Sequence, residues 1–245
     1  MVARIFINEE PVISDGLKTT DVLWRYLDAA KLLDFLQNQT LFFCRGDEFD
    51  DKHEGAFTEL LRDSINSSYS TNNIAYTFDE FKRTIRSHVF VNCWHRSPDD
   101  SMAMWRIYGI SNCSVALTTT VGKLQAALRE QRIQHLLSIE KVQYVKHWRN
   151  PELDISPYSR VFAYKTKAYD FEKEVRVLID RSVGEFDDEI AEIGMAIKIS
   201  QKTLLRSIVI SPEAPPWFDS LVRAVAEKFG ITAPVRRSKL ATDPV

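Results

Sequence analysis

Residues 171–179, with the sequence FEKEVRVLI, constrain the fold more than any other stretch of this chain. Their alternation at a period of two predicts a β-strand with Glu172, Glu174 and Arg176 on one face. The other face is apolar apart from Lys173 and is expected to belong to the core. Because same-face neighbours on a strand lie about 6.6 Å apart, two carboxylates and a guanidinium form a compact polar row.

This polar row has two interpretations. In the first, it is an exposed sheet face on which Arg176 bridges the acids, an arrangement that is common and contributes little to stability. In the second, one carboxylate stabilises developing positive charge while the other accepts a proton or orients a nucleophile. The strand alone does not choose between them.

The rest of the chain reads as short strands and helices in irregular order. The clearest unit is a strand at 21–26, a helix at 29–37 capped by Asp28, and a strand at 40–44. Further strands are expected at 89–94, 113–118, 139–145, 196–200 and 207–211, and further helices at 55–65, 79–86, 101–108, 121–132 and 215–229. Polar or charged loops are expected at 67–73, 146–158 and 184–192.

Few of these strands are joined by a helical crossover, which predicts an α+β fold. We expect a single domain at 21–240 with a split, mostly antiparallel sheet flanked by helices. An N-terminal arm at 1–20 and a tail at 241–245 complete the expected organisation.

Composition sets limits on partners and compartment. The formal net charge of −2 and the pI near 6.2 give no global electrostatic reason to bind nucleic acid or an anionic membrane. The three cysteines, Cys44, Cys93 and Cys113, lack metal-site spacing and are read as reduced thiols. No apolar stretch approaches the roughly 18 residues that span a bilayer, and no leader pattern opens the chain. We therefore expect a cytoplasmic protein without a membrane partner.

Four motifs then follow one another in a familiar order. They are LWRY at 23–26, an acidic loop at 49–54, Cys93-Trp94 followed by Met104-Trp105 and Tyr108, and FEKEVR at 171–176. Over about residues 22–240 the chain resembles a bacterial domain family of unassigned biochemistry that includes abortive-infection proteins of the AbiGi type. This resemblance implies a role in antiviral defence and marks functional candidates, which are Asp51, Glu54, Trp94, Trp105 and Tyr108.

The acidic loop departs from that family in part. The family usually has Phe-Asn-Asp-Pro-aromatic-Glu, and this chain has FDDKHE at 49–54. Asp51 and Glu54 keep the pattern, whereas Asp50 and Lys52 replace the asparagine and the proline.

The order of parts is also similar to that of ADP-ribosyltransferase folds. Those folds have an arginine or histidine on the first strand, a helix, a second strand ending in a small nucleophilic residue, and a glutamate opening a late strand. The corresponding residues here are Arg25, Cys44 and Glu174. In arginine-directed transferases the late glutamate belongs to a Glu-x-Glu pair, which residues 172–174 match.

This second resemblance implies transfer of ADP-ribose from NAD to a macromolecular acceptor, either nucleic acid or protein. Glu174 would stabilise the oxocarbenium-like transition state and Glu172 would orient or deprotonate the acceptor. Arg25 would clamp the pyrophosphate, and Tyr26, Cys44 and Arg176 would complete the NAD site. Such a toxin implies a neutralising antitoxin or a defence partner, and no metal. On this reading Glu174→Gln abolishes activity and leaves folding intact.

Two rival functions stay open. The acidic loop at 47–54 gathers oxygen ligands and one imidazole, as Mg²⁺ or Mn²⁺ sites of nucleases and hydrolases do. Alternatively, the chain is a non-catalytic sensor or binding module of a phage-defence system, with Trp94 and Trp105 stacking on nucleic acid. Stabilisation by NAD, by Mn²⁺ or by neither separates the three functions.

Overall fold

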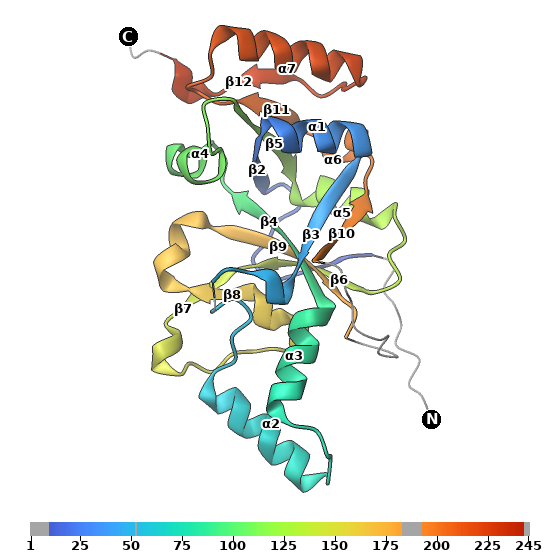
Figure 1. The fold of residues 1–245 in the computed structure, drawn as a ribbon, viewed down its shortest axis with the longest axis vertical. Coiled ribbons are helices and arrows are strands. Elements are labelled where there is room, and N and C mark those ends of the chain that lie inside the picture. The colour runs from blue at the N-terminus through green and yellow to red at the C-terminus, as the bar shows by residue number, and fades with distance from the viewer. Residues whose placement is uncertain (1–9, 52, 183–192, 243–245) are drawn as a thin grey trace. The chain divides into compact units, whose positions relative to one another are not determined.

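The computed structural model describes residues 10–51, 53–182 and 193–242. The chain divides into two compact units, each assembled from three segments. The first unit takes residues from 1–15, 42–92 and 133–195, and the second takes them from 16–41, 93–132 and 196–245. Figure 1 labels the helices and strands of both units.

The first unit is built on antiparallel strands. In its sheet β6 (Leu136–Lys141) pairs antiparallel with β9 (Glu174–Asp180), and β9 is followed by β4 (Val89–Arg96). Three further strands extend this arrangement: β1 (Val12–Ile13) parallel to β6, β3 (Thr40–Arg45) antiparallel to β4, and β10 (Gly194–Lys198) paired with β3. Parts of β3, β4 and β10 belong to the second unit. A separate parallel pair joins β7 (Gln143–Val145) to β8 (Tyr164–Thr166). Short 3-10 turns lie at Gly46–Glu48, His147–Arg149, Tyr158–Ala163 and Lys167–Glu172.

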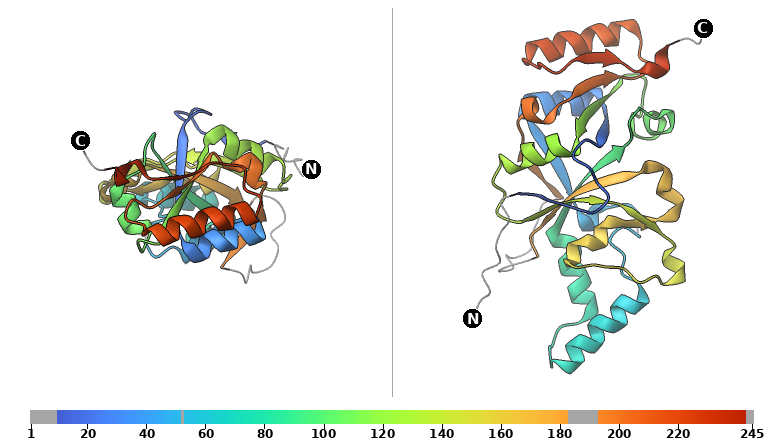
Figure 2. Two further views of the ribbon diagram at one scale, coloured as in Figure 1. Left: turned by 90° about the horizontal axis from the view of Figure 1, so that it is seen from above. Right: turned by 180° about the vertical axis from the view of Figure 1, so that it is seen from behind.

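Two helices of the first unit form a hairpin. They are α2 (Glu59–Thr71) and α3 (Phe78–His88), which meet at an angle in Figures 1 and 2, with α2 beyond the end of α3. Thr58 caps α2, and α3 opens with a capping box of Thr77 and Glu80. The loop expected at 67–73 is wrong, because α2 continues to Thr71, whose hydroxyl donates back to the carbonyl of Ser67 at 2.8 Å. Polar composition suggested a loop there, but these hydroxyls satisfy helical carbonyls instead.

The second unit contains the strand–helix–strand opening that the sequence predicts. In it β2 (Val22–Asp28) leads into α1 (Ala29–Asn38), and Asp28 accepts a hydrogen bond from the backbone of Lys31 at 2.8 Å. Antiparallel pairing joins the C-terminal part of β4 to β2, β2 to β5 (Ser114–Thr120), and β5 to β11 (Ser207–Ile210), while β12 (Val235–Arg237) lies parallel to β11. The helical elements are α4 (Met102–Tyr108), α5 (Val121–Arg129), α6 (Gln201–Leu204), α7 (Pro216–Lys228) and a 3-10 turn at Lys239–Ala241.

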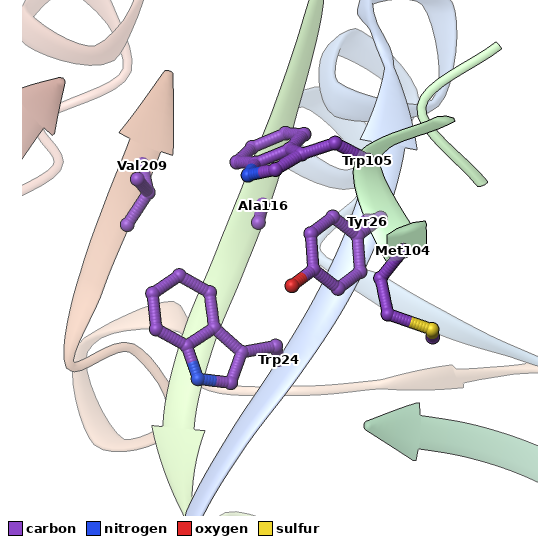
Figure 3. Close-up of a cluster of buried hydrophobic side chains, with 6 residues drawn as sticks. All are labelled: Trp24, Tyr26, Met104, Trp105, Ala116 and Val209. Atoms are coloured by element: carbon purple, nitrogen blue, oxygen red, sulfur yellow. The ribbon is translucent and has the colours of Figure 1, made fainter. Parts of the chain in front are cut away.

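An aromatic cluster forms part of the core of the second unit (Figure 3). The Tyr26 ring stacks with Trp24 at 6.3 Å between centroids and meets the edge of Trp105 at 4.8 Å. Each indole finds an acceptor, since Trp24 donates to the carbonyl of Ser97 at 2.8 Å and Trp105 donates to Asp100 at 3.0 Å. The rings are therefore buried with their polar atoms satisfied.

The observed architecture confirms a mixed α/β fold with mostly antiparallel strands and flanking helices. The single domain at 21–240 with its arm and tail stays a prediction, and the acidic loop expected at 184–192 lies outside the described residues. The longest helices that the structure describes, α2 and α7, have 13 residues each, and none has the length and apolar character needed to cross a bilayer.

Candidate active site

Five charged side chains gather in the interior of the first unit. Lys165 comes from β8, Glu174 and Arg176 come from β9, Glu172 ends a 3-10 turn, and Glu54 comes from the acidic loop. All five are buried, with exposed fractions between 0% and 7%. Together they form the charged cluster.

Arg176 lies deepest in the charged cluster. Its guanidinium donates from Nη1 and Nη2 to Glu54 at 2.5 and 2.9 Å, and from Nε to Glu174 at 2.6 Å. Nη1 also donates to the carbonyl oxygen of Phe162 at 2.8 Å. The guanidinium is planar and donates to a carboxylate on each of two sides, so Arg176 fixes the positions of both Glu54 and Glu174.

Lys165 lies at the point where three carboxylates converge. Its ammonium is 2.5 Å from Glu172 Oε2, 3.1 Å from Glu174 Oε1 and 3.3 Å from Glu54 Oε1. The ammonium thus forms ion pairs with carboxylates from three different parts of the chain. Lys165 is not predictable from the sequence, because it lies on a strand of three residues and shares no motif with its partners.

The backbone brings Glu172 into the cluster in a way that alternation did not predict. Strand β9 begins at Glu174, and Lys173 takes the left-handed conformation with φ of 43°. Glu172 therefore lies outside the strand. The prediction that Glu172, Glu174 and Arg176 form a row on one face of a strand is wrong for Glu172. The left-handed turn nevertheless directs both glutamates to Lys165, and the polar row is buried where the first interpretation expected it to be exposed.

Glu54 lies in a tight turn that directs its side chain to Arg176. The backbone of Glu54 donates to the carbonyl of Asp51 at 2.9 Å, and Gly55 follows with φ of 63°. A β-carbon at Gly55 would lie 2.6 Å from the ring of Phe162, the residue whose carbonyl binds Arg176. Glycine is thus required here both for the positive φ and for the close approach. Asp51 keeps a structural place in this turn, and its Oδ1 accepts from the backbone of His53 at 2.9 Å.

The cluster holds Glu174 in its ionised form. Burial opposes ionisation, but the charges of Arg176 and Lys165 outweigh burial and lower the pKa of Glu174 to about 2. Burial likewise works against the Lys165 ammonium, but Glu174 and Glu54 outweigh burial and raise the pKa of Lys165. Both groups are therefore charged at neutral pH.

The charged cluster is most accessible at Glu174 and Lys165. Each of these two side chains is 8% exposed, whereas the side chains of Glu54 and Arg176 are 2% and 0% exposed. The ring of Tyr169 lies 4.7 Å from the Lys165 ammonium, and the Tyr144 hydroxyl accepts from the backbone of Glu174 at 2.7 Å. An approaching ligand would therefore meet Glu174 before the buried arginine.

Arg25 has one guanidinium nitrogen without a hydrogen-bond partner. It lies on β2 in the second unit, 5.9 Å from the ring of the buried Trp94. Its Nη1 is buried without a hydrogen-bond partner, and burial lowers the pKa of Arg25. A half-buried cation with one buried, unpartnered donor is chemically suited to an anion.

The other candidates lie in varied surroundings. Tyr26 and Trp105 belong to the aromatic cluster of the second unit, while Tyr108 ends α4 and is exposed. Cys44 is half-buried in β3, and burial followed by the nearby Glu48 and Asp47 raises the pKa of its thiol. The Cys44 thiol is therefore protonated at neutral pH, which opposes a nucleophilic role.

The acidic loop does not present its carboxylates to a common point. Asp47 and Glu48 bind Arg45 at 2.6 and 2.9 Å, whereas Glu54 turns inward to Arg176. Within residues 10–51, 53–182 and 193–242, no group of three or more histidine, cysteine or acidic side chains is arranged to hold a metal ion.

Comparisons with known proteins give one distant likeness. No family profile matches the sequence, and no curated protein matches it. Among solved structures, the chain is similar to Thermus sp. 2.9 DarT in complex with ADP-ribosylated ssDNA, with a TM-score of 0.40 and 7% identity over 94% of this chain and 98% of the other. A likeness at this level does not assign an activity, and the AbiGi-type resemblance stays a prediction.

Proposed function

We propose that this protein is an ADP-ribosyltransferase, which cleaves the nicotinamide–ribose bond of NAD and transfers ADP-ribose to a macromolecule. The observation that carries the proposal is the Glu174 carboxylate, which is buried, held ionised, and among the most accessible groups of the charged cluster. Three acids and two bases are expensive to bury, and a purely structural network would be replaceable by apolar side chains. A reaction in which positive charge develops on the substrate would be stabilised by the ionised Glu174 carboxylate of this site.

In the proposed reaction the nicotinamide nitrogen leaves with the electron pair of the bond to ribose C1′. Positive charge develops on the ribose, and a fixed carboxylate stabilises that cation more than it stabilises neutral ribose. Glu174 supplies this carboxylate. The acceptor nucleophile then forms a bond to C1′ and releases its proton to solvent.

The neighbouring residues take supporting roles in this proposal. Glu172, held by its ion pair with Lys165, orients or deprotonates the acceptor. Lys165 and Arg176 are positioning residues, because their contacts fix the Glu174 carboxylate. The role that the sequence predicts for Arg25, binding a phosphate of NAD, is kept in the proposal, because its unpartnered Nη1 is a donor suited to an anion. A toxin of this kind would act in bacterial defence under the control of a neutralising partner.

Incubation of the wild-type protein with NAD labelled in its adenosine half tests the proposal. Single-stranded DNA and a total protein extract serve as acceptors in separate reactions, and free nicotinamide is measured in each. Nicotinamide release with label on one acceptor is the expected result. If nicotinamide is released but all of the label is found in free ADP-ribose, the protein is an NAD hydrolase and not a transferase. If no nicotinamide is released, both activities are contradicted.

A further inference from the structure

A second site lies in the first unit, away from Glu174. An open pocket of about 1100 Å³ is lined by the α2–α3 hairpin, the segment 152–158 and the C-terminal end of β9. Asp180, which lines it, is six residues beyond Glu174 on the same strand, a separation of about 20 Å at ~3.3 Å per residue. The pocket is therefore distinct from the charged cluster.

Aromatic side chains form much of its wall. Tyr69 and Tyr76 lie 5.9 Å apart, and Phe81 meets the ring of Tyr158 edge to face at 4.8 Å. Tyr158 is 50% exposed, so part of its ring is available to a ligand. Aromatic faces attract organic cations.

The charges of the pocket have one sign. Among the described residues that line it, the charged side chains are Glu152, Asp154 and Asp180, all of them carboxylates. Arg160 forms an ion pair with Asp154 at 2.7 Å, so the net negative charge of the pocket lining comes from Glu152 and Asp180. A phosphate-bearing ligand would be repelled and a cation attracted.

Asp180 has an acceptor to spare. The residue is 1% exposed, and its Oδ1 accepts from the backbone and hydroxyl of Ser182 at 2.8 and 2.5 Å. Its Oδ2 is buried without a hydrogen-bond partner. His135 does not neutralise it, because burial and the charge of Arg181 lower the pKa of His135 and leave it uncharged at pH 7. An unpaired buried carboxylate oxygen is costly, and an N–H donor from a ligand would relieve that cost.

We propose that this pocket binds an organic cation that carries N–H groups, a guanidinium or a primary ammonium. The aromatic wall and the carboxylates select positive charge, and the unpartnered oxygen of Asp180 selects a cation that can donate. The site is independent of the proposed transferase reaction.

Calorimetric titration with three probes tests this inference. Butylguanidinium is cationic and donates, butylurea donates but is neutral, and butyltrimethylammonium is cationic but cannot donate. We expect saturable binding of butylguanidinium at least tenfold tighter than that of either other probe. An arginine capped at both ends is titrated beside it: tighter binding of the capped arginine identifies a protein side chain as the source, and equal binding identifies a free small molecule. Equal affinity for all three butyl probes, or no binding of butylguanidinium, would overturn the proposal.

Two variants locate the site. Asp180→Asn keeps the shape of the side chain and removes its charge, and we expect it to weaken butylguanidinium binding at least tenfold. Tyr158→Ala removes a half-exposed ring without opening the core, and we expect severalfold weaker binding even if Asp180→Asn does not fold. Trp217→Ala, which removes an exposed ring of α7, serves as a control that binds like wild type. Unchanged affinity in Tyr158→Ala would show that the probe binds elsewhere.

Discussion

Neutralising Glu174 should destabilise the folded protein, in contrast to the sequence-based expectation that Glu174→Gln leaves folding intact. The pKa of this carboxyl is lowered from 4.5 to about 2 in the folded protein. A difference of roughly 2.5 units at about 1.36 kcal/mol per unit gives about 3 kcal/mol of stability at pH 7. Glutamine keeps the shape of the side chain but cannot form ion pairs with Arg176 and Lys165.

The pH dependence of this effect has a definite sign. Because the folded pKa is depressed, the contribution is fully present above pH 4.5 and is lost as the pH falls through 4.5 towards 2. The difference in unfolding free energy between wild type and Glu174→Gln should therefore shrink from about 3 kcal/mol at pH 7 to about 1.4 kcal/mol at pH 3.

Urea denaturation followed by circular dichroism at pH 7 and pH 3 measures this difference. Glu140→Gln is the matched control, since Glu140 is also buried and ion-paired, 3.7 Å from Arg160, but burial raises the pKa of Glu140. Loss of the Glu140 charge should therefore not destabilise the protein at pH 7. A Glu174→Gln difference below 1 kcal/mol at pH 7, or one equal at both pH values, would refute the electrostatic account.

Three further substitutions test the cluster and its surroundings. Lys165→Met leaves three carboxyl groups without their ammonium and should cost about 3–5 kcal/mol in urea denaturation, whereas Lys167→Met, which breaks an exposed pair with Asp170, should change stability by less than about 1 kcal/mol. Gly55→Ala should cost about 2 kcal/mol or more, because its β-carbon meets Phe162, while Gly230→Ala, also at positive φ but with open space around it, should cost about 1 kcal/mol; equal losses would refute the close-approach argument. Arg25→Ala should weaken NAD binding roughly 10- to 100-fold by calorimetry, and an unchanged affinity would remove the phosphate-binding role.

Local patterns predicted the elements well where a cap or an apolar run marked them. Asp28 opens α1 as expected, and the alternating run from Val175 to Ile179 is a buried strand. The pattern at 67–73 predicts a loop because serine, threonine and asparagine favour turns, yet the Thr71 hydroxyl and the Asn72 amide donate to helical carbonyls of α2. The choice between these two uses of a polar side chain depends on neighbours that the sequence does not reveal.

The candidate site was only partly predictable for a related reason. Glu172, Glu174 and Arg176 were found because they lie within five residues of one another, and Glu54 was found through a motif. Their common neighbour Lys165 could not be found, since no spacing rule links a three-residue strand to a loop more than 100 residues away. Burial was also not predictable, because an alternating strand of charged and apolar residues is usual on an exposed face. The left-handed turn at Lys173 is equally hidden, as lysine has no preference for that conformation.

The measurement that tests the central claim most directly is the rate of nicotinamide release from NAD by wild type, Glu174→Gln and Glu140→Gln. All three are assayed at one temperature below the lowest of their melting temperatures, so that each is folded. We predict that wild type and Glu140→Gln release nicotinamide at similar rates, and that Glu174→Gln is slower by about 100-fold or more. A folded Glu174→Gln protein as fast as wild type would contradict the role of the Glu174 carboxylate in the reaction.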